Sequence, residues 1–240
     1  MYLNIVIPVL NEENSLANGV EKTIQYLNTT VLRERFMITI ADNGSIDNTE
    51  TVARNLIDNY PMVDYFKVSQ KGVGLAFREA IKRNTCDVVG YMDVDLATDL
   101  CHLKQVCYLF KKKQAQIVVG SRLKKGAKVY GRTLLREITS RGLNIILKLL
   151  LQVKFTDAMC GFKFYRKDIA DKLVQICSDN NGWFYCAEMM IRAEWNHIKV
   201  TEIPVIWRDD IDSKVKVGAL SVSYMKEILK LCKIKRGMHE

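Results

Sequence analysis

Short apolar runs alternate with amphipathic stretches along most of the chain. The apolar runs have the length and the β-branched composition of strands, and they cover residues 3–10, 36–41, 63–69, 87–94, 116–121 and 200–207. The stretches between them place apolar residues at helical spacing, beginning with positions 16, 20, 24 and 27. Strands that alternate with helices predict an α/β fold whose mostly parallel central sheet is flanked by helices.

After residue 130 the pattern becomes more helical. It predicts helices over residues 132–152, 167–178 and 185–196, followed by a basic C-terminal helix. No segment rich in proline, glycine and serine separates the two parts, so residues 1–240 are predicted to form a single domain. Within this domain we distinguish three segments, which cover residues 1–121, 122–217 and 218–240.

Polar, turn-forming residues follow four of the predicted strands. They form the segments PVLNEE (8–13), ADNGSIDNT (41–49), DVD (93–95) and GSR (120–122). Each segment alone is typical of an ordinary polar turn or helix cap. Ligands of open α/β sheets, however, bind outside the carboxyl ends of the strands, where all four segments are expected. Their convergence predicts one binding site.

The segment VVGYMDVDLATDL (88–100) ends an apolar run with Asp93, Asp95 and Asp99. Mg²⁺ takes one or two protein carboxylates and fills its remaining positions with water and substrate phosphates. The pair of Asp93 and Asp95 therefore suits a metal that is bound to a diphosphate. The same residues also suit a polar turn that ends a strand, and D-x-D arises by chance in many chains, so both interpretations stay open at this point.

Composition and charge narrow the class of protein. With 48% hydrophobic and 26% charged residues, the chain is typical of a globular protein and not of a disordered one. A net charge of +9 indicates an anionic partner, which can be nucleic acid, anionic lipid or a phosphorylated substrate. The sequence shows no zinc-finger spacing and no aromatic RNA-binding signature, so nucleic acid is not expected as a partner.

The cysteines and the N-terminus indicate the cellular environment. The 7 cysteines are odd in number and include no C-x-x-C pair, which argues against a disulfide framework and against a zinc site. The first residues, MYLNIVIPVLNEEN, have no basic region before the apolar run, so no signal peptide is expected. No run reaches the roughly 18 apolar residues that span a bilayer. These features predict a reducing, cytoplasmic environment.

Eight segments together carry a resemblance to a known family. VIPVLNEENSL, ADNGSIDNT, KGVGLAFREA, MDVDLATDL, VGSR, DAMCGFKFYRK, WFYCAEMMIRA and EIPVIW occur in the order and at the intervals typical of family 2 glycosyltransferases with the GT-A fold. The resemblance covers residues 3 to 216. Through TDAMCGFKFYRK and IPVIWRDDIDSKV, the chain most resembles the polyprenyl-phosphate sugar transferases, such as the dolichyl-phosphate glucosyl- and mannosyltransferases.

The resemblance implies an activity and a role for each matching position. The activity is transfer of a hexose, with inversion, from UDP-hexose or GDP-hexose to a polyprenyl phosphate, with Mg²⁺ or Mn²⁺ as cofactor. Residues 1–121 then form the nucleotide-sugar-binding half and residues 122–217 the acceptor-side half. The implied nucleotide-sugar-binding residues are Pro8, Leu10, Glu12, Asp42, Asn43, Lys71, Gly74 and Asp93. The implied metal ligands are Asp93 and Asp95, and the implied phosphate- or acceptor-binding residues are Arg122, Arg136, Arg141 and Arg208.

Two positions depart from the family pattern. Ala97 stands where mannosyl-transferring relatives often have Gln, and Cys186 stands where relatives often have Asp. Asp99 can replace the missing Gln as a ligand, directly or through water, or it can cap the following helix.

The acceptor decides whether catalysis needs a base in addition to the metal-binding Asp95. A monophosphate has a second pKa of about 6 and is already largely ionised at neutral pH, so it needs steering by arginine more than deprotonation. A hydroxyl acceptor needs a general base within reach, for which Asp157 and Glu188 are the candidates.

The basic helices raise the question of a membrane. Residues 134–153 and the C-terminal helix combine apolar residues with lysine and arginine, which is typical of helices that lie in an anionic interface. The alternative is that both are ordinary helices packed on the core. We expect a peripheral protein on the cytoplasmic face of a membrane, with or without a membrane partner protein. Two other functions stay open: transfer to a hydroxyl of a soluble or lipid-linked glycan, and an inactive nucleotide-sugar-binding scaffold.

Overall fold

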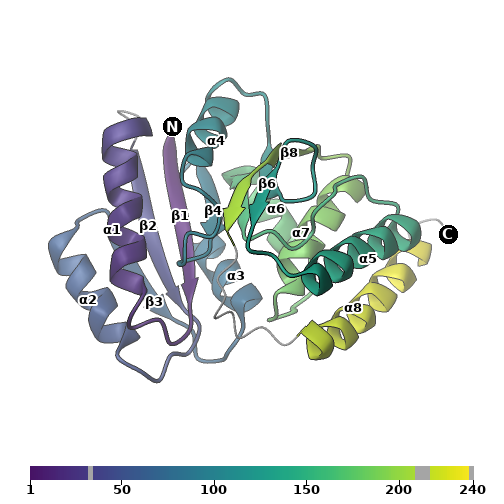
Figure 1. Cartoon of the computed structure of the whole chain (residues 1–240), viewed down its shortest axis with the longest axis horizontal. Coiled ribbons are helices and arrows are strands. Elements are labelled where there is room, and N and C mark those ends of the chain that lie inside the picture. Colours follow the sequence, from purple (N-terminus) through teal and green to yellow (C-terminus); the bar gives the residue numbers. More distant parts are fainter. Residues whose placement is uncertain (32–34, 209–216, 238–240) are drawn as a thin grey trace.

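The computed structural model describes residues 1–31, 35–208 and 217–237 (Figure 1). Its strands are β1 (Tyr2–Val9), β2 (Arg35–Asp42), β3 (Val63–Lys67), β4 (Val88–Met92), β5 (Ile117–Ser121), β6 (Lys128–Tyr130), β7 (Phe162–Arg166), β8 (Val200–Pro204) and β9 (Ile206–Arg208). Its α-helices are α1 (Leu16–Tyr26), α2 (Thr49–Asn59), α3 (Val73–Arg83), α4 (His102–Lys111), α5 (Leu134–Leu151), α6 (Lys167–Ile176), α7 (Phe184–Trp195) and α8 (Val217–Gly237). Residues 209–215 of the segment IPVIWRDDIDSKV and residues 238–240 lie outside the described part.

A seven-stranded sheet forms the centre of the molecule, with the strand order β3-β2-β1-β4-β7-β5-β8. Within this described sheet, β7 runs antiparallel to its neighbours β4 and β5, and the other neighbouring strands are parallel. Strands β6 and β9 form a separate two-stranded parallel ribbon. The predicted α/β fold, with a mostly parallel sheet flanked by helices, is confirmed.

Three details of the strand prediction are wrong. The sequence pattern does not predict the short strand β6, and it does not predict β7, whose alternating side chains include a lysine that is buried in the structure. Residues 200–207, which the pattern predicts as one strand, form β8 and part of β9, because the chain changes sheets at Val205. The N–H of Val205 donates to the carbonyl of Ser121 (3.2 Å), and its carbonyl accepts from Lys128 N (2.9 Å). Val205 therefore belongs to the hydrogen bonding of both sheets.

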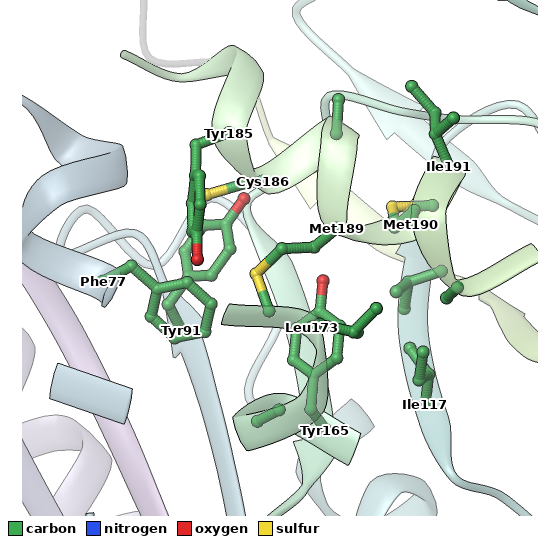
Figure 2. Packing of buried hydrophobic residues seen from close by; sticks show 14 of the residues in the cluster. Phe77, Tyr91, Ile117, Tyr165, Leu173, Tyr185, Cys186, Met189, Met190 and Ile191 are labelled. Carbon is green, nitrogen blue, oxygen red and sulfur yellow. The ribbon is translucent and has the colours of Figure 1, made fainter. Parts of the chain in front are cut away.

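Each face of the sheet packs against its own set of helices. On β1, Ile5 and Ile7 belong to a cluster with α1, α2 and α4, whereas Val6 belongs to a second cluster with α3, α6 and α7. In the second cluster, the ring of Phe77 on α3 has its centroid 4.9 Å from that of Tyr91 on β4 (Figure 2). Burial on both faces explains why the strands are continuous apolar runs.

Helices α5 and α8 lie side by side, at the end of the molecule opposite α1 and α2 (Figure 1). Each packs one face on the core, through Leu147 and Leu151 of α5 and through Ile228 and Leu231 of α8, all of which are buried. No helix in the described part of the chain is both long and apolar enough to cross a bilayer. The division of the domain at residues 121 and 217 stays a prediction.

The buried contacts of α6 predict a large loss of stability on truncation. Leu173 on α6 is completely buried in the cluster of Figure 2. We expect Leu173→Ala to lower the free energy of unfolding by about 2–5 kcal/mol, because it removes apolar contacts and leaves a cavity. The matched control, Leu149→Ala on the exposed side of α5, should stay within about 0.5 kcal/mol of the wild type. Urea denaturation followed by circular dichroism measures both, and equal effects would contradict this packing.

Candidate active site

The loops that follow β1 and β2 are joined by hydrogen bonds between backbone and side chains. The N–H of Asn11, which has a φ of 56°, donates to Ser45 Oγ (3.0 Å), and Asn11 Oδ1 accepts from Ile46 N (2.9 Å). Glu12 N donates to Thr49 Oγ1 (2.8 Å). Because β1 and β2 are parallel and paired up to Val9 and Asp42, both loops lie at one edge of the sheet. That edge holds the predicted nucleotide-binding residues Pro8, Leu10, Glu12, Asp42 and Asn43.

Asp42 is completely buried, and its carboxylate accepts hydrogen bonds from other groups of the protein. Its Oδ1 accepts from Gly44 N (3.0 Å) and Ser45 N (2.7 Å), and its Oδ2 accepts from Tyr65 OH (2.8 Å). Asn43 is nearly as buried, and its Oδ1 accepts from the N–H of Gly72. Asp42 thus holds the loop after β2 in shape, and its direct contact with a nucleotide sugar stays a prediction.

The glycine-containing loop before α3 packs against the loop before α7. Gly74 N donates to the carbonyl of Asn181 (2.9 Å), and a Cβ added to Gly72 would lie 2.3 Å from the same oxygen. Arg78 reinforces the contact by donating to Asn181 Oδ1 (2.9 Å). The structure therefore uses these glycines to join residues 1–121 to the segment that follows them, while Lys71 beside them is exposed. Binding of a nucleotide sugar by Lys71 and Gly74 stays a prediction.

Asp93 and Asp95 follow the carboxyl end of β4, at the same edge of the sheet. The carboxylate of Asp93 lies directly against Gly161, where an added Cβ would be only 1.9 Å from Asp93 Oδ2. Burial and the charge of Asp95 raise the pKa of Asp93 to about 7, against the opposite effects of Lys163 and Arg122. Asp95 is exposed, and its Oδ1 accepts from the N–H of Ala97 (2.9 Å). The two carboxylates therefore belong to one site, in which Asp93 is half-buried and Asp95 is exposed.

Strand β9 holds the loop that contains these carboxylates. Arg208 N donates to the carbonyl of Ala97 (2.8 Å), and Asp99 N donates to the carbonyl of Ile206 (3.0 Å). The side chain of Asp99 accepts from Cys101 N (2.9 Å) and pairs with Arg208 Nη1 (3.4 Å). Of the two roles open for Asp99, these contacts favour shaping the turn before α4 over ligating a metal.

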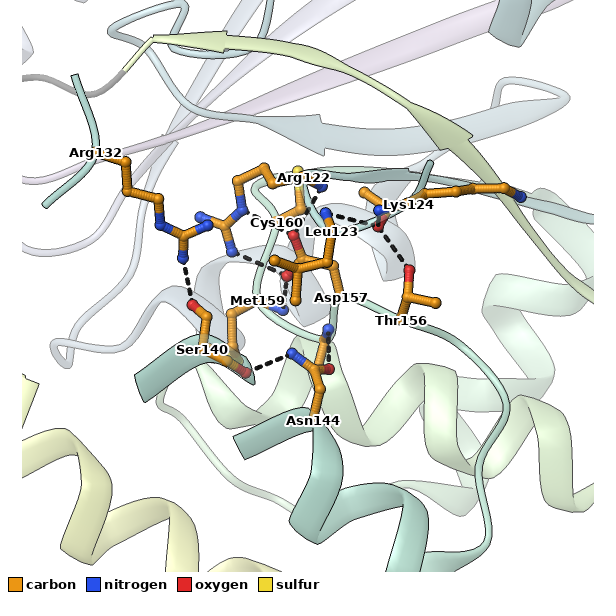
Figure 3. A network of polar contacts seen from close by, with 12 residues as sticks. Arg122, Leu123, Lys124, Arg132, Ser140, Asn144, Thr156, Asp157, Met159 and Cys160 are labelled. Carbon is orange, nitrogen blue, oxygen red and sulfur yellow. Dashed lines mark hydrogen bonds and ion pairs between the residues drawn. The ribbon is translucent and has the colours of Figure 1, made fainter. Parts of the chain in front are cut away.

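Arg122 and Asp157 form a buried ion pair between the loop after β5 and the loop before β7 (Figure 3). Asp157 Oδ2 accepts from Arg122 N (3.0 Å) and Nε (2.8 Å), and Oδ1 accepts from Arg122 Nη2 (2.9 Å) and Met159 N (3.2 Å). Burial alone would raise the pKa of Asp157, but the charge and hydrogen bonds of Arg122 outweigh it and hold the pKa at about 2. Arg122 also lies over the ring of Trp207, 5.2 Å from its centroid.

These contacts bear on Asp157 as a candidate base. A carboxylate has about four lone-pair sites, and the four hydrogen bonds to Asp157 use all of them. A base must accept a proton, and both the saturation and the low pKa oppose that. The geometry therefore favours a positioning role for Asp157, which stays a prediction like the alternative role of base.

Lys163 is a member of the site that the sequence pattern does not single out. It is completely buried on β7 opposite Tyr91 of β4, and its Nζ donates to Tyr91 OH (3.2 Å) and to the carbonyl of Cys160. Burial lowers its pKa from the ordinary value, and its charge in turn lowers the pKa of Asp93. The signal that reveals it is the strand-like alternation of FKFYR, which places this lysine on the face opposite Phe162 and Phe164.

The remaining predicted arginines lie at the start of α5 and on β9. Arg141 pairs with Glu137 (2.6 Å), one turn earlier on α5, and Arg132 pairs with the same carboxylate (3.2 Å). Arg136 lies on the first turn of this helix, where its N–H donates to Thr133 Oγ1 (3.4 Å). Binding of a phosphate by the predicted arginines would therefore compete with carboxylates that already hold some of them.

Glu188 on α7 is engaged away from the paired carboxylates. It accepts from Ser178 N (3.0 Å) and from Arg192 Nε (3.2 Å), both on or next to α6 and α7. Two residues earlier on the same helix, the thiol of Cys186 lies beside Tyr91, and burial raises the pKa of Cys186 to about 11. Cys186 thus belongs to the buried apolar cluster with Tyr91 and Tyr185 (Figure 2), whereas a role for Glu188 as base stays a prediction.

The pair of Asp93 and Asp95 fits a divalent ion that brings its own oxygen ligands. Two carboxylates close enough for the charge of Asp95 to raise the pKa of Asp93 gain stability from a shared cation. In the part of the chain that the structure describes, no three His, Cys, Asp or Glu side chains gather as a metal site of their own. The donor set therefore suits Mg²⁺ or Mn²⁺ that also binds phosphate oxygens and water.

The sequence matches the model of glycosyl transferase family 2 over residues 4–174. The chain belongs to glycosyl transferase family 2. The family predicted from the eight segments is thus confirmed, and with it the class of enzyme, a glycosyltransferase. The functional residues within the family stay predictions.

Curated relatives and solved structures agree with this family. The chain is 29% identical over 214 residues to glycosyltransferase AglD of Haloferax volcanii, covering 89% of this chain and 34% of AglD. It is 27% identical to dolichyl-phosphate β-glucosyltransferase ALG5D of Trichomonas vaginalis, covering 92% of this chain and 70% of that protein. The fold is similar to that of glucosyl-3-phosphoglycerate synthase from Mycobacterium tuberculosis in complex with UDP, with a TM-score of 0.71, 19% identity, and coverage of 97% of this chain and 80% of that one. The chain therefore spans about a third of the length of AglD and shares the GT-A fold.

The contact between Gly161 and Asp93 predicts that an added methyl group weakens metal binding. In Gly161→Ala the new Cβ would overlap the carboxylate of Asp93 and displace it. We expect the affinity for Mn²⁺ with UDP to fall by about 10- to 100-fold, as it does when the support of a ligand is lost. Calorimetry measures the affinity. The matched control is Gly142→Ala on α5, where a Cβ meets nothing within 4 Å, and equal affinities in both variants would contradict the contact.

The ion pair predicts a specific dependence of stability on pH. Because the pKa of Asp157 is held at about 2, below an unfolded value of about 3.9, the ionised carboxylate stabilises the fold above the unfolded value. This contribution is lost as the pH falls towards 2. Asp157→Asn should cost about 3–5 kcal/mol at neutral pH, since it leaves Arg122 buried without a counter-charge. Between pH 7 and pH 3, the free energy of unfolding measured by urea denaturation should fall less in the variant than in the wild type. Parallel plots of this free energy against pH for the two proteins would contradict the pairing.

Proposed function

We propose that the protein is a metal-dependent, inverting hexosyltransferase that moves a hexose from a nucleotide sugar to a polyprenyl phosphate of the dolichyl type. One observation supports the proposal above all others: in a chain of family 2, Asp93 and Asp95 follow β4 at the sheet edge that also carries the loops after β1 and β2. In open α/β sheets this edge is where ligands bind.

The groups around Asp93 suit a leaving diphosphate. Asp93 and Asp95 would hold Mg²⁺ or Mn²⁺, and the ion supplies neutralisation of the negative charge on the leaving group. Gly161 leaves room for the carboxylate of Asp93, and the charges of Lys163 and Arg122 favour its ionised form. These groups thereby help to keep the carboxylate of Asp93 ionised for a cation, although burial opposes its ionisation.

The acceptor side suits a phosphate better than a hydroxyl. All lone pairs of Asp157 are used, and Glu188 is hydrogen-bonded to Ser178 and Arg192, so neither carboxylate is arranged to remove a proton. A phosphate acceptor is already ionised and needs positively charged groups, which Arg136, Arg141 and Arg208 can provide by exchanging their present partners. A glycan hydroxyl remains the alternative acceptor.

The relatives suggest which substrates to test. A dolichyl-phosphate β-glucosyltransferase among them suggests a polyprenyl phosphate acceptor, and the synthase solved with Mn²⁺, UDP-glucose and phosphoglyceric acid suggests UDP-glucose as donor. Such an acceptor lies in a bilayer, so we place the protein peripherally on the cytoplasmic face of a membrane.

Calorimetry of donor binding tests the proposal. UDP-glucose, UDP-GlcNAc, UDP-galactose and GDP-mannose are titrated with and without Mn²⁺ into the wild type and Asp95→Ala. We expect one donor to bind in a metal-dependent way and to lose at least about tenfold in affinity in Asp95→Ala, because the variant removes a metal ligand. The preferred donor is then offered with polyprenyl phosphate or with free polyprenol and soluble sugars.

The outcomes separate the alternatives. Transfer to the phosphate supports the proposal. Transfer to a hydroxyl acceptor would show that the acceptor is a hydroxyl and not a polyprenyl phosphate. Donor binding without any turnover would point to a nucleotide-sugar-binding scaffold. If folded protein bound none of the donors, Asp93 and Asp95 would be a strand-ending turn.

A further inference from the structure

Exposed apolar side chains gather on α5 and α8. Of the large apolar side chains that are exposed in the described residues, nine lie on these two helices: Leu134, Leu135, Ile138, Ile145, Leu149, Leu150, Met225, Leu229 and Ile234. The others, Ile46, Tyr108 and Tyr130, are scattered over separate elements. Exposed apolar residues that occur singly are ordinary, whereas a contiguous group marks a surface for interaction.

The spacing on α5 makes this group a stripe. Leu134, Ile138, Ile145 and Leu149 recur at intervals of four and seven residues, which places them on one side of the helix, and they are 77%, 59%, 56% and 74% exposed. The core-facing side of α5 is separate and is formed by Asn144, Leu147 and Leu151. Helix α5 therefore has two apolar sides, and the core of the protein uses one of them.

Basic residues predominate among the charged residues of both helices. On α5 and on the part of α8 whose side chains are described, the charged residues are Arg136, Arg141, Lys148, Lys226, Lys230, Lys233, Lys235 and Arg236 against Glu137 and Glu227. Apolar side chains flanked by lysine and arginine complement an anionic bilayer, in which the chains insert at the boundary of headgroups and acyl chains. The same excess of positive charge disfavours contact between two copies of this face.

We propose that the α5–α8 face, defined by the nine exposed apolar residues above, is a docking surface for an anionic lipid bilayer, on which both helices lie in the plane of the membrane. The choice of a lipid as the partner rests on the proposed function, in which the acceptor is a lipid phosphate. The proposal names the residues that insert, with the stripe on α5 at the centre.

The position of the face relative to the active site supports this orientation. The side of α5 that faces the protein binds the acceptor-side loop, since Asn144 Oδ1 accepts from Ala158 N (2.9 Å), next to Asp157 (Figure 3). The side chain of Arg132, which lies over Trp207, donates to Ser140 of the same helix. A bilayer under the outer side of α5 is therefore separated from the acceptor-side residues by the width of one helix.

Vesicle flotation tests the face without nucleotide sugar or metal. The wild type is mixed with vesicles of phosphatidylcholine alone and with vesicles that also contain phosphatidylglycerol. We expect binding to the second kind, weakened by high salt, and a loss of about tenfold or more in Ile138→Ser/Leu149→Ser, because two inserted side chains are removed. The matched control is Tyr108→Ser, which removes an exposed side chain of similar size from α4 and should bind as the wild type does.

A charge variant and a donor titration complete the test. Lys226→Gln/Lys230→Gln should lower binding to anionic vesicles and reduce its dependence on salt. All variants should keep the metal-dependent donor affinity of the wild type. If neither the wild type nor any variant binds a donor, the proposed function is overturned. The vesicle result then still decides the docking surface on its own. No binding of the wild type to anionic vesicles, or equal binding of the stripe variant, would overturn the docking surface. Light scattering tests whether the face joins two copies instead. That outcome would be a wild type that is a dimer and does not bind vesicles, and an Ile138→Ser/Leu149→Ser variant that is a monomer.

Discussion

The buried ion pair between Arg122 and Asp157 is the contact on which the arrangement of the second half of the chain depends. Moving two charges out of water costs several kcal/mol each, so such a pair is stable only when its geometry and its other hydrogen bonds are complete. Here the backbone and guanidinium of Arg122 and the amide of Met159 together satisfy the carboxylate. The pair thereby joins the end of β5 to the loop before β7, and Trp207 brings β9 to the same point.

The predicted metal ligands, Asp93 and Asp95, belong to one half of the chain, but the other half shapes their surroundings. Asp93 follows β4, yet the space for its carboxylate is created by Gly161, and part of its electrostatic environment comes from Lys163 on β7. A second connection lies at the start of α3, where Gly72 and Gly74 contact the loop before α7. The two halves therefore pack as one body at the level of individual atoms, although the boundary drawn between them stays a prediction.

The sequence predicts the parts of the fold that depend on local pattern, and it misses those that depend on partners distant in the chain. Continuous apolar runs identify the parallel strands because both faces of the sheet are covered. Strand β7 escapes the pattern because Lys163 looks like a solvent-facing residue until Tyr91 and the carbonyl of Cys160 are beside it. For the same reason Arg122 and Arg208 are recognisable as basic positions, while their pairing with Asp157 and Asp99 appears only in three dimensions. The pair of Arg141 and Glu137 differs, because its members lie four residues apart on a predicted helix and the spacing already indicates it.

The exposed stripe on α5 also has a consequence for the protein in dilute buffer. Its apolar side chains present an adhesive area to any surface, including vessel walls and partly unfolded chains. What opposes this is colloidal repulsion, which comes from the net charge of +9 and weakens as salt shortens the Debye length. Handling at low ionic strength favours dispersion, whereas high salt removes the repulsion and leaves the adhesive area unchanged. Mild detergent instead reduces the adhesive area itself, because its micelles cover the stripe.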